Sequence, residues 1–418
     1  MRIVHFSQSH AENGAGAAAY RLHRALLDIG LDSTMVVGLP GADDSTILPG
    51  GGSRFSRVMV PYVNALVAQQ AGARRLFSSG LFSYGHIDRD LVQGADAVVL
   101  HWITGGFLSP RQLRDLPKSV FWRLSDIWAF SGGCHFPGEC TRFEAACGSC
   151  PALASRHEWD LSRLEWQAKR RAYEGLNLTI VAPSRWIAEC AQRSTLLKNR
   201  RIVHIPTGVD TNRFRPLDKA QARAMFGLPY DRRIVLFGAL RSTEDPRKGY
   251  RYLQAALQRL TGRSESRDWH LVIFGGPANS SVGESETIGF PISWVGRLHD
   301  EVSLALLFSA ADVLIAPFIE DNLPNVVLEA AACGLPVVAF DAGGLPDIIE
   351  HQRTGWLASV GDSDSLAQGL GWVLADEVRR RELSNAARAK IEATFALERC
   401  AQKWKKLMTD SAMIALPV

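Results

Sequence analysis

The sequence predicts an α/β protein built from two doubly wound domains. Two observations lead to this prediction. The chain has 418 residues, enough for two or three domains, and short apolar runs without polar alternation recur along it between helical stretches. Such runs are typical of strands in buried parallel sheets, and two successive series indicate two domains. Because ligands gather outside the carboxyl ends of parallel strands, we expect the two domains to face a central cleft.

The expected strands fall into two series along the chain. The first comprises Arg2–Ser7, Ser33–Gly38, Asp96–His101, Lys118–Arg123, Leu178–Pro183 and Arg201–Pro206. The second comprises Arg233–Leu240, His270–Gly275, Ile292–Val295, Asp312–Pro317 and Pro336–Phe340. A turn-rich segment at residues 206–216 separates them. We therefore expect one domain at 1–205, a second at 206–395, and a C-terminal helix at 396–418 that returns to the first domain.

Composition and charge exclude several classes of protein. With 46% hydrophobic and 22% charged residues, the chain can bury a core, which excludes disordered and fibrous classes. Its 47 basic and 43 acidic residues give a net charge of +4, too weak a balance to indicate nucleic-acid binding. The N-terminus lacks the apolar region of a secretory signal, and no apolar run is long enough to span a membrane. We expect a cytoplasmic protein.

The densest group of candidate functional residues lies at residues 316–334. Here a strand ends, a polar turn follows, and a helix begins near Pro324 and ends before Gly334. The free N–H groups of its first turn, near Asn325 and Val326, suit an anion. These residues predict a phosphate site at the helix N-terminus.

Two carboxylates flank that expected phosphate site. Glu329 lies five residues past Pro324, about 7.5 Å along the helix axis. That spacing matches the distance from a diphosphate to its ribose, so Glu329 can accept the ribose hydroxyls. Asp321 precedes the helix and would lie beside the group on the other side of the phosphates. The alternative interpretation of Glu329 is a solvated helix carboxylate.

Lys248 is the candidate cation for a diphosphate. It stands in the segment Asp245-Pro-Arg247-Lys248-Gly249, which follows an expected strand and opens a helix. A cation there can neutralise a diphosphate leaving group. The alternative is a surface lysine.

Several motifs, in order along nearly the whole chain, resemble the retaining glycosyltransferases of the GT-B fold, family 4. They are Ala182-Pro-Ser184-Arg-Trp, Ile205-Pro-Thr-Gly208-Val-Asp210, Arg247-Lys248-Gly249, the acidic pair Asp321 and Glu329 at E-x7-E spacing, and Gly343-Gly344-Leu-Pro-Asp347. The segment from Asp126 to His135, followed by Cys147-Gly-Ser-Cys150-Pro, is similar to the narrower WcaC-like branch of colanic-acid and exopolysaccharide transferases.

The resemblance implies two Rossmann-like domains and transfer of a sugar with retention of configuration. The donor would be a nucleotide-diphosphate sugar, with UDP or GDP, bound by the C-terminal domain. The N-terminal domain would bind a glycan or lipid-linked acceptor in cell-surface polysaccharide biosynthesis. No cofactor would be required for catalysis. Two alternatives use the same fold: a nucleotide-sugar 2-epimerase, and a non-catalytic sugar-nucleotide-binding assembly partner.

The resemblance also implies roles for individual residues. Ser125 stands where the family has a histidine, so His101 and His135 are candidate substitutes, each with a structural role as the alternative. Ala239 replaces the family's arginine, so the second cation is either Arg241 or Arg247, or it is absent. The expected catalytic residues are Asp321, Lys248 and His101; the expected donor-binding residues are Glu329, Lys248, Arg247, Arg241, Asn325, Val326 and Leu323; and the expected acceptor or phosphate loop contains Gly14, Gly16, Asp126 and His135.

The glycines Gly14 and Gly16 follow the first expected strand and lead into a helix. Small residues there let the backbone approach a phosphate or an acceptor closely. The alternative is a tight turn that packs the helix on the strand.

Four cysteines cluster at residues 134–150: Cys134, Cys140, Cys147 and Cys150. The closing C-x2-C is a spacing that zinc sites use for two thiolates. Three interpretations stay open: a structural Zn²⁺, buried thiols or a reversible disulfide, and a redox function. His135 is an alternative ligand in the first.

The stretch from Val58 to Ala68 is apolar and is followed by Arg74 and Arg75. It fits a helix on the anionic inner leaflet of a membrane, where lipid-linked acceptors would lie. The alternative is a core helix.

Overall fold

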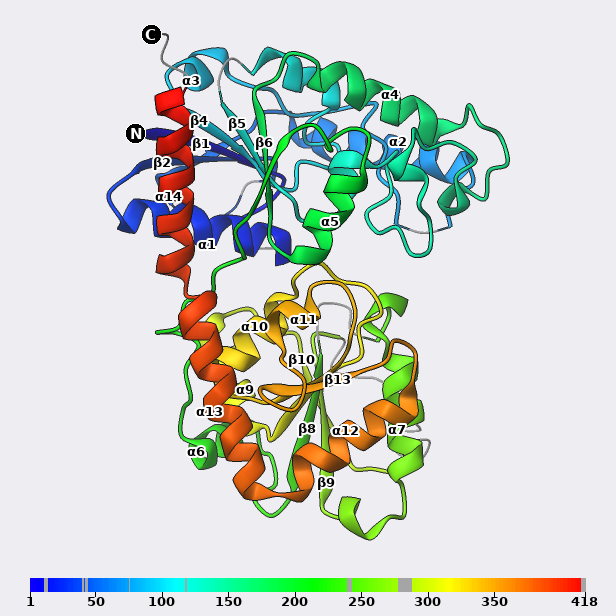
Figure 1. The fold of residues 1–418 in the computed structure, drawn as a ribbon, viewed down its shortest axis with the longest axis vertical. Coiled ribbons are helices and arrows are strands. Elements are labelled where there is room, and N and C mark those ends of the chain that lie inside the picture. The colour runs from blue at the N-terminus through cyan, green and yellow to red at the C-terminus, as the bar shows by residue number, and fades with distance from the viewer. Residues whose placement is uncertain are drawn as a thin grey trace. The chain divides into compact units, whose positions relative to one another are not determined.

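The computed structural model describes residues 1–10, 14–39, 41, 44–74, 76–116, 119–238, 243–276 and 288–414. The chain forms two compact units, shown with their elements in Figure 1. Unit 1 contains Met1–Gly208 and the C-terminal residues from Glu398, and unit 2 contains Val209–Leu397. The division after Gly208 lies near the expected boundary after residue 205, and helix α14 (Leu397–Ile414) groups with unit 1 from Glu398 onward.

In the described part of unit 1, seven parallel strands form one sheet in the order β3-β2-β1-β4-β5-β6-β7. They are β1 (Arg2–Ser7), β2 (Asp32–Val37), β3 (Ile47–Pro49), β4 (Ala97–Leu100), β5 (Val120–Arg123), β6 (Leu178–Ala182) and β7 (Arg201–His204). Strands β4, β5 and β6 are buried at every residue, and β1 is buried except at Arg2, as expected for the centre of a parallel sheet. The strand order reverses between β1 and β4, which is the point where doubly wound sheets bind ligands.

The helices of unit 1 begin at polar caps. Asp160 accepts hydrogen bonds from the backbone at the start of α4, and Ser184 does so for α5. The helices are α1 (Gly14–Asp28), α2 (Arg54–Gln70), α3 (Arg89–Gln93), α4 (Leu161–Tyr173), α5 (Arg185–Arg193) and α14, with 3₁₀ turns η1 (Pro110–Asp115), η2 (Trp128–Phe130), η3 (Arg142–Glu144) and η4 (Pro151–Leu153).

In the described part of unit 2, six parallel strands form a sheet in the order β10-β9-β8-β11-β12-β13, which reverses between β8 and β11. The strands are β8 (Arg233–Gly238), β9 (Trp269–Phe274), β10 (Ile292–Gly296), β11 (Val313–Ala316), β12 (Val337–Phe340) and β13 (Gly355–Ala358). The helices are α6 (Lys219–Met225), α7 (Tyr250–Leu260), α9 (Glu301–Ala310), α10 (Asn325–Ala332), α11 (Leu345–Ile348), α12 (Ser363–Ala375) and α13 (Glu377–Thr394), with 3₁₀ turns η5 (Pro246–Lys248) and η6 (Ser264–Ser266).

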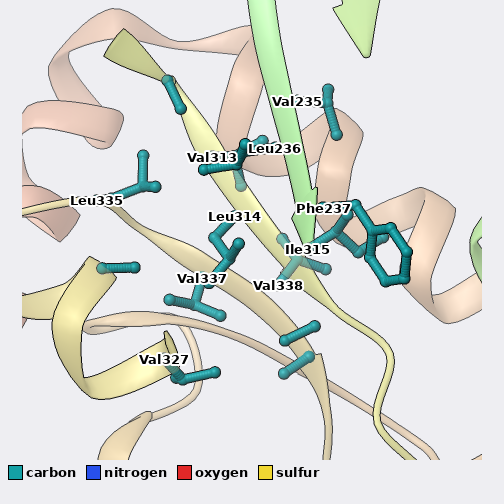
Figure 2. Close-up of a cluster of buried hydrophobic side chains, with 14 of the residues drawn as sticks. Val235, Leu236, Phe237, Val313, Leu314, Ile315, Val327, Leu335, Val337 and Val338 are labelled. Carbon is teal, nitrogen blue, oxygen red and sulfur yellow. The ribbon is translucent and has the colours of Figure 1, made fainter. Parts of the chain in front are cut away.

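The core of unit 2 fixes α10 against the sheet. Val327 of α10 packs with strand residues such as Leu314 and Val337, and all three are fully buried (Figure 2). Burying each such side chain stabilises the fold by about 1.5–3 kcal/mol. The N-terminus of α10 is therefore held at a defined place beside the carboxyl ends of β11 and β12.

The predicted pair of doubly wound parallel domains is confirmed, and each expected strand overlaps an observed one. Two strands were not predicted. β3 has three residues and ends at Pro49, and β13 begins at Gly355 and has four residues. Both are short and lie at the edges of their sheets. Their apolar runs are only three and four residues long and include a proline or a glycine, which is too weak a local signal to predict a strand.

The interpretation of the stretch around Val58 as a core helix holds for one face only, where Val60 and Ala68 pack against apolar clusters of unit 1. Helix α2 buries only Asn64 and Ala68, and its outer side exposes Phe55 at 74%, Val58 at 66% and Tyr62 at 56%. Arg75, part of the expected basic flank, lies outside the described residues. Within the described ranges, no helix has the length and apolar character needed to cross a bilayer.

Candidate functional site

The central feature of unit 2 is an ion pair at the carboxyl edge of its sheet. The Lys248 Nζ donates to Asp321 Oδ2 at 2.6 Å, and the two side chains are 15% and 17% exposed. The ammonium also lies 4.3 Å from the centroid of the Phe318 ring. Lys248 follows β8 and Asp321 follows β11, the two strands at which the order reverses. The structure thus brings together the predicted cation and one of the two predicted carboxylates.

Backbone packing positions Lys248. Gly249 has φ 72°, and a Cβ there would lie 1.9 Å from the carbonyl oxygen of Pro317. The Ile319 N–H donates to the Arg247 carbonyl at 2.9 Å. Only glycine fits both the left-handed conformation and the close approach. The Lys248 turn is therefore fixed directly against the segment that leaves β11.

A second glycine positions Asp321. Gly343 follows β12 with φ 55°, and a Cβ there would lie 1.9 Å from the carbonyl oxygen of Asp321. The Gly344 N–H donates to that same oxygen at 3.1 Å. Loops after three neighbouring strands, β8, β11 and β12, therefore meet around Asp321.

Helix α10 begins directly after this turn. Pro324 is its N-cap, Asn325 and Val326 form its first turn, and Leu323 is 7% exposed. Glu329 is only 6% exposed on the same helix. The interpretation of Glu329 as a solvated carboxylate is therefore wrong, because its side chain lies inside the protein.

Of the two candidates for a second cation, Arg247 lies within the described residues and Arg241 does not. The Arg247 Nη2 donates to Asp245 Oδ2 at 2.6 Å, and the Arg247 side chain is 25% exposed. Its guanidinium is thus held by the carboxylate two residues earlier. Arg241 lies outside the described residues, as does Ala239.

In unit 1, Gly16 serves close packing. A Cβ on Gly16 would lie 2.5 Å from Ser9 Oγ and 2.8 Å from the Ser9 carbonyl oxygen, so α1 approaches the loop after β1 very closely. This contact supports the tight-turn alternative for Gly16. Gly14 is exposed at the start of α1. The Gln8 N–H donates to the Trp102 carbonyl at 2.8 Å and joins the loops after β1 and β4.

Asp126 and His135 form a buried pair beside those loops. The His135 Nδ1 lies 2.6 Å from Asp126 Oδ2, and its Nε2 lies 2.7 Å from Ser78 Oγ. The Trp102 indole N–H donates to the same Asp126 oxygen at 2.9 Å. His135 is fully buried and both of its ring nitrogens have partners. The pair fixes the loop after β5 to the rest of unit 1.

His101 lies in the core of unit 1. Its Nε2 is 2.9 Å from His5 Nδ1, and the residue is 1% exposed. Burial lowers the pKa of His101 well below its ordinary value, and the neighbouring His5 lowers it further. The imidazole is therefore neutral, which supports the structural alternative for His101.

The four clustered cysteines line one small cavity. Cys134, Cys140, Cys147 and Cys150 are all free thiols around a space of about 10 Å³. Burial raises the pKa of Cys147 to about 12 and raises those of Cys134 and Cys150. His135 does not line this cavity, because its ring nitrogens face Asp126 and Ser78.

Two buried charged side chains on α4, Glu165 and Lys169, were not predicted from the sequence. The Lys169 Nζ donates to the carbonyls of Trp128 and Ser131 at 2.5 and 3.0 Å. Glu165 Oε1 accepts from the Ser79 hydroxyl at 2.8 Å and from the Gly80 N–H at 2.9 Å. A sequence signal existed: Glu165 and Lys169 are four residues apart, on the same helix face as apolar residues.

Comparison with known sequences identifies a domain within unit 2. Residues 231–376 match the family model described as Glycosyl transferases group 1. The chain is 34% identical over 202 residues to D-inositol 3-phosphate glycosyltransferase of Mycobacteroides abscessus, a match that covers 46% of this chain and 42% of that protein. The corresponding match in Mycobacterium tuberculosis H37Ra is 33% over 216 residues, covering 47% and 41%. The chain thus matches less than half the length of these curated relatives.

Comparison with solved structures confirms the GT-B fold. Sucrose-phosphate synthase from Thermosynechococcus elongatus aligns with a TM-score of 0.70 at 21% identity, covering 98% of this chain and 99% of that one. Anabaena HepE in complex with UDP-glucose gives 0.65 at 15% identity, covering 98% and 100%. WaaG, a glycosyltransferase involved in lipopolysaccharide biosynthesis, gives 0.65 at 14% identity, covering 97% and 99%. At these identities the likeness concerns the fold alone.

Proposed function

We propose that the protein is a retaining glycosyltransferase that moves a sugar from a nucleotide-diphosphate sugar to a glycan or lipid-linked acceptor in cell-surface polysaccharide biosynthesis. Unit 2 binds the donor and unit 1 the acceptor. The observation that carries this proposal is the Lys248–Asp321 pair. It lies where the strand order of unit 2 reverses, inside the region that matches the group 1 glycosyltransferase model.

The reaction needs positive charge where the diphosphate leaves. An ammonium has three N–H donors, so Lys248 can hold Asp321 with one and phosphate oxygens with the others. The first turn of α10, at Asn325 and Val326, adds backbone N–H groups. Together with Arg247, these groups stabilise the departing diphosphate, so we propose that catalysis needs no metal at that position.

The two carboxylates divide the recognition of the donor. Asp321 accepts hydrogen bonds from hydroxyls of the sugar, and its backbone is held by close contacts with Gly343 and Gly344. Glu329, on the buried side of α10, accepts hydrogen bonds from the ribose hydroxyls. A pre-positioned carboxylate is most effective where positive charge develops on the sugar ring in the transition state.

A screen of UDP-sugars and GDP-sugars by thermal shift, followed by product analysis, tests this function. A donor present at 100 times its Kd adds about 2.7 kcal/mol to stability. With that donor, slow hydrolysis should release a sugar of the same anomeric configuration as the donor, which NMR detects at early times. Inverted product contradicts retention. A 2-epimerised sugar supports the epimerase alternative, and donor binding without turnover in the presence of glycan acceptors supports the non-catalytic one.

We propose in addition that α2 rests on an anionic membrane surface. The exposed side chains Phe55, Val58 and Tyr62 form an apolar stripe beside the exposed Arg54, the pattern of an interfacial helix. Co-sedimentation with phosphatidylglycerol vesicles should fall strongly in a Phe55→Ser/Tyr62→Ser double variant. Equal sedimentation of the parent with phosphatidylcholine vesicles, or no loss in the variant, would contradict this contact.

A further inference from the structure

The segment between η2 and α4 has little regular structure. Across residues 131–160, all of which the structure describes, the chain forms two short 3₁₀ turns, η3 and η4. A small apolar cluster that includes Phe77, Cys150 and Leu153 supports it. Ordering each residue of such a segment costs backbone conformational entropy. A segment of this length and composition needs a further source of order.

Four sulfur ligands surround one space inside this segment. Cys134, Cys140, Cys147 and Cys150 line the same cavity of about 10 Å³. That is room for about one small sphere, the size of a single water or ion rather than a metal cluster. The remaining cysteines of the chain, Cys190, Cys333 and Cys400, lie elsewhere.

The turn that joins Cys147 to Cys150 is strained. Cys147 has φ 54°, Gly148 has φ 87° and Ser149 has φ 44°, so three successive residues are left-handed and two of them are not glycine. A non-glycine residue in this conformation is strained. The Cys150 N–H donates to Asp160 Oδ2 at 2.8 Å, which ties the turn to the start of α4. This left-handed turn places Cys147 and Cys150 at one cavity.

Hydrogen-bond donors and a buried cation lie near the sulfurs, although burial raises the pKa of the thiols. The Gly132 N–H donates to the Cys147 sulfur, and the Ala152 and Leu153 N–H groups donate to the Cys150 sulfur. Backbone donors of this kind strengthen and orient ligands that carry negative charge. The buried Lys169 ammonium interacts electrostatically with Cys134 and Cys147. Four thiolates around a divalent cation carry a net charge of −2, which this ammonium partly offsets.

We propose that Cys134, Cys140, Cys147 and Cys150 bind one structural Zn²⁺. In the described residues, no group of three or more His, Cys, Asp or Glu side chains is arranged to hold a metal as it stands. Rotation of a cysteine about χ1 moves its sulfur without moving the backbone, and the proposal requires such rotations to bring the four sulfurs into a tetrahedron around the metal. Sulfur ligands in that geometry select zinc or an iron–sulfur centre, and a space for one small ion selects zinc.

Binding displaces the thiol protons to solvent, while each sulfur keeps its electron pair and donates it to the metal. No oxidation or reduction is involved. Zinc would close the loop that carries His135, next to Cys134, and would so support the His135–Asp126 pair. Its loss should loosen unit 1 and leave nucleotide binding by unit 2 unchanged.

Elemental analysis of the full chain, purified without chelator or metal-affinity resin, tests the proposal. We expect about one zinc per chain in the parent. The control variant Cys190→Ser, which removes a buried cysteine outside the cluster, should carry the same amount. Cys134→Ser and Cys150→Ser should carry close to none. Full zinc occupancy in both cluster variants, or iron in place of zinc in the parent, would overturn the assignment.

Cobalt gives a measurement that does not depend on the folding of a variant. After native removal of metal from the parent, added Co²⁺ should produce the visible absorption of a tetrahedral thiolate site, and one equivalent of Zn²⁺ should abolish it. A parent that carries no zinc and shows no such absorption has no metal site in this segment, and the proposal would then be wrong.

Discussion

Unit 2 holds the Lys248–Asp321 pair and unit 1 holds the His135–Asp126 pair, each beside the carboxyl edge of its sheet, and the two pairs differ in burial rather than in length. Lys248–Asp321 and His135–Asp126 both measure 2.6 Å. The side chains are 15% and 17% exposed in the first pair, against 1% and 10% in the second. The His135 ring is held further by Ser78, and Asp126 by Trp102. The two pairs therefore have the same length but differ in how far solvent reaches them.

A partly exposed pair can exchange one partner for a ligand, because water and ligand reach it at little cost. A buried pair with all its hydrogen bonds made loses stability when either partner changes. We accordingly assign the pair in unit 2 to chemistry and the pair in unit 1 to architecture. The predictions for Lys248 and His135 test that contrast, and those for Asp312 give the effect expected of a fully buried carboxylate for comparison.

The largest effect should come from Asp312, which lies at the opposite end of β11 from Asp321. Its carboxylate is buried and bonded to Lys219, to Arg223 at 2.7 Å, and to the Ile234 N–H at 2.7 Å. Asp312→Asn should lower the free energy of unfolding of unit 2 by about 3–5 kcal/mol, because the buried Arg223 loses its charged partner. Urea denaturation measures this. A change no larger than in Asp268→Asn, an exposed carboxylate, would contradict it.

The Asp312 contribution should also depend on pH. Burial acts to raise the pKa of Asp312, but Lys219 and the backbone donor outweigh it, and the net pKa is below its ordinary value. The folded state therefore binds the proton less tightly than the unfolded state does. Its contribution is full above the unfolded pKa of about 3.9 and disappears as pH falls through the folded pKa. The stability gap to Asp312→Asn should stay constant from pH 7 to 5 and close in stronger acid. A gap that closes near neutrality would contradict this sign.

Next in size is the effect of Lys248→Met on turnover. The variant should lose about 10²-fold in kcat, because the cation acts mainly on the charge that develops in the transition state. Its melting temperature should change little, since the pair is partly exposed. Arg251→Met, which removes an exposed cation nearby on α7, is the matched control and should retain its activity. Equal kcat in Lys248→Met and the parent would rule out the proposed role.

A smaller effect is expected from His135→Gln. Breaking its buried hydrogen bonds should cost unit 1 about 1–3 kcal/mol. Nucleotide affinity, a property of unit 2, should not change. Urea denaturation of the variant measures its stability, and calorimetric titration of nucleotide into the same sample measures its affinity. A His135 variant of full stability but lost acceptor use would show that this pair is functional, and the contrast between the units would fail.

The sequence predicted the sheets well because buried parallel strands are continuous apolar runs. It also placed Lys248, Asp321 and Glu329 on the correct loops and helix, since a strand, a turn and a capped helix leave local signals. It could not show that Lys248 and Asp321 touch, because that contact depends on Gly249 and Gly343 approaching distant carbonyls. Nor could it show that one face of α2 is exposed while Lys169 is buried, because burial is decided by tertiary packing.

The central claim is that unit 2 binds the nucleotide of the donor with Glu329 at its ribose. Calorimetric titration of UDP and GDP into the parent and into Glu329→Gln tests it most directly. The parent should bind at least one of the two nucleotides, and the variant should bind it about 10-fold to 100-fold more weakly, the loss of a charged hydrogen bond. Equal affinity in the parent and Glu329→Gln, or no binding of either nucleotide by the parent, would contradict the claim.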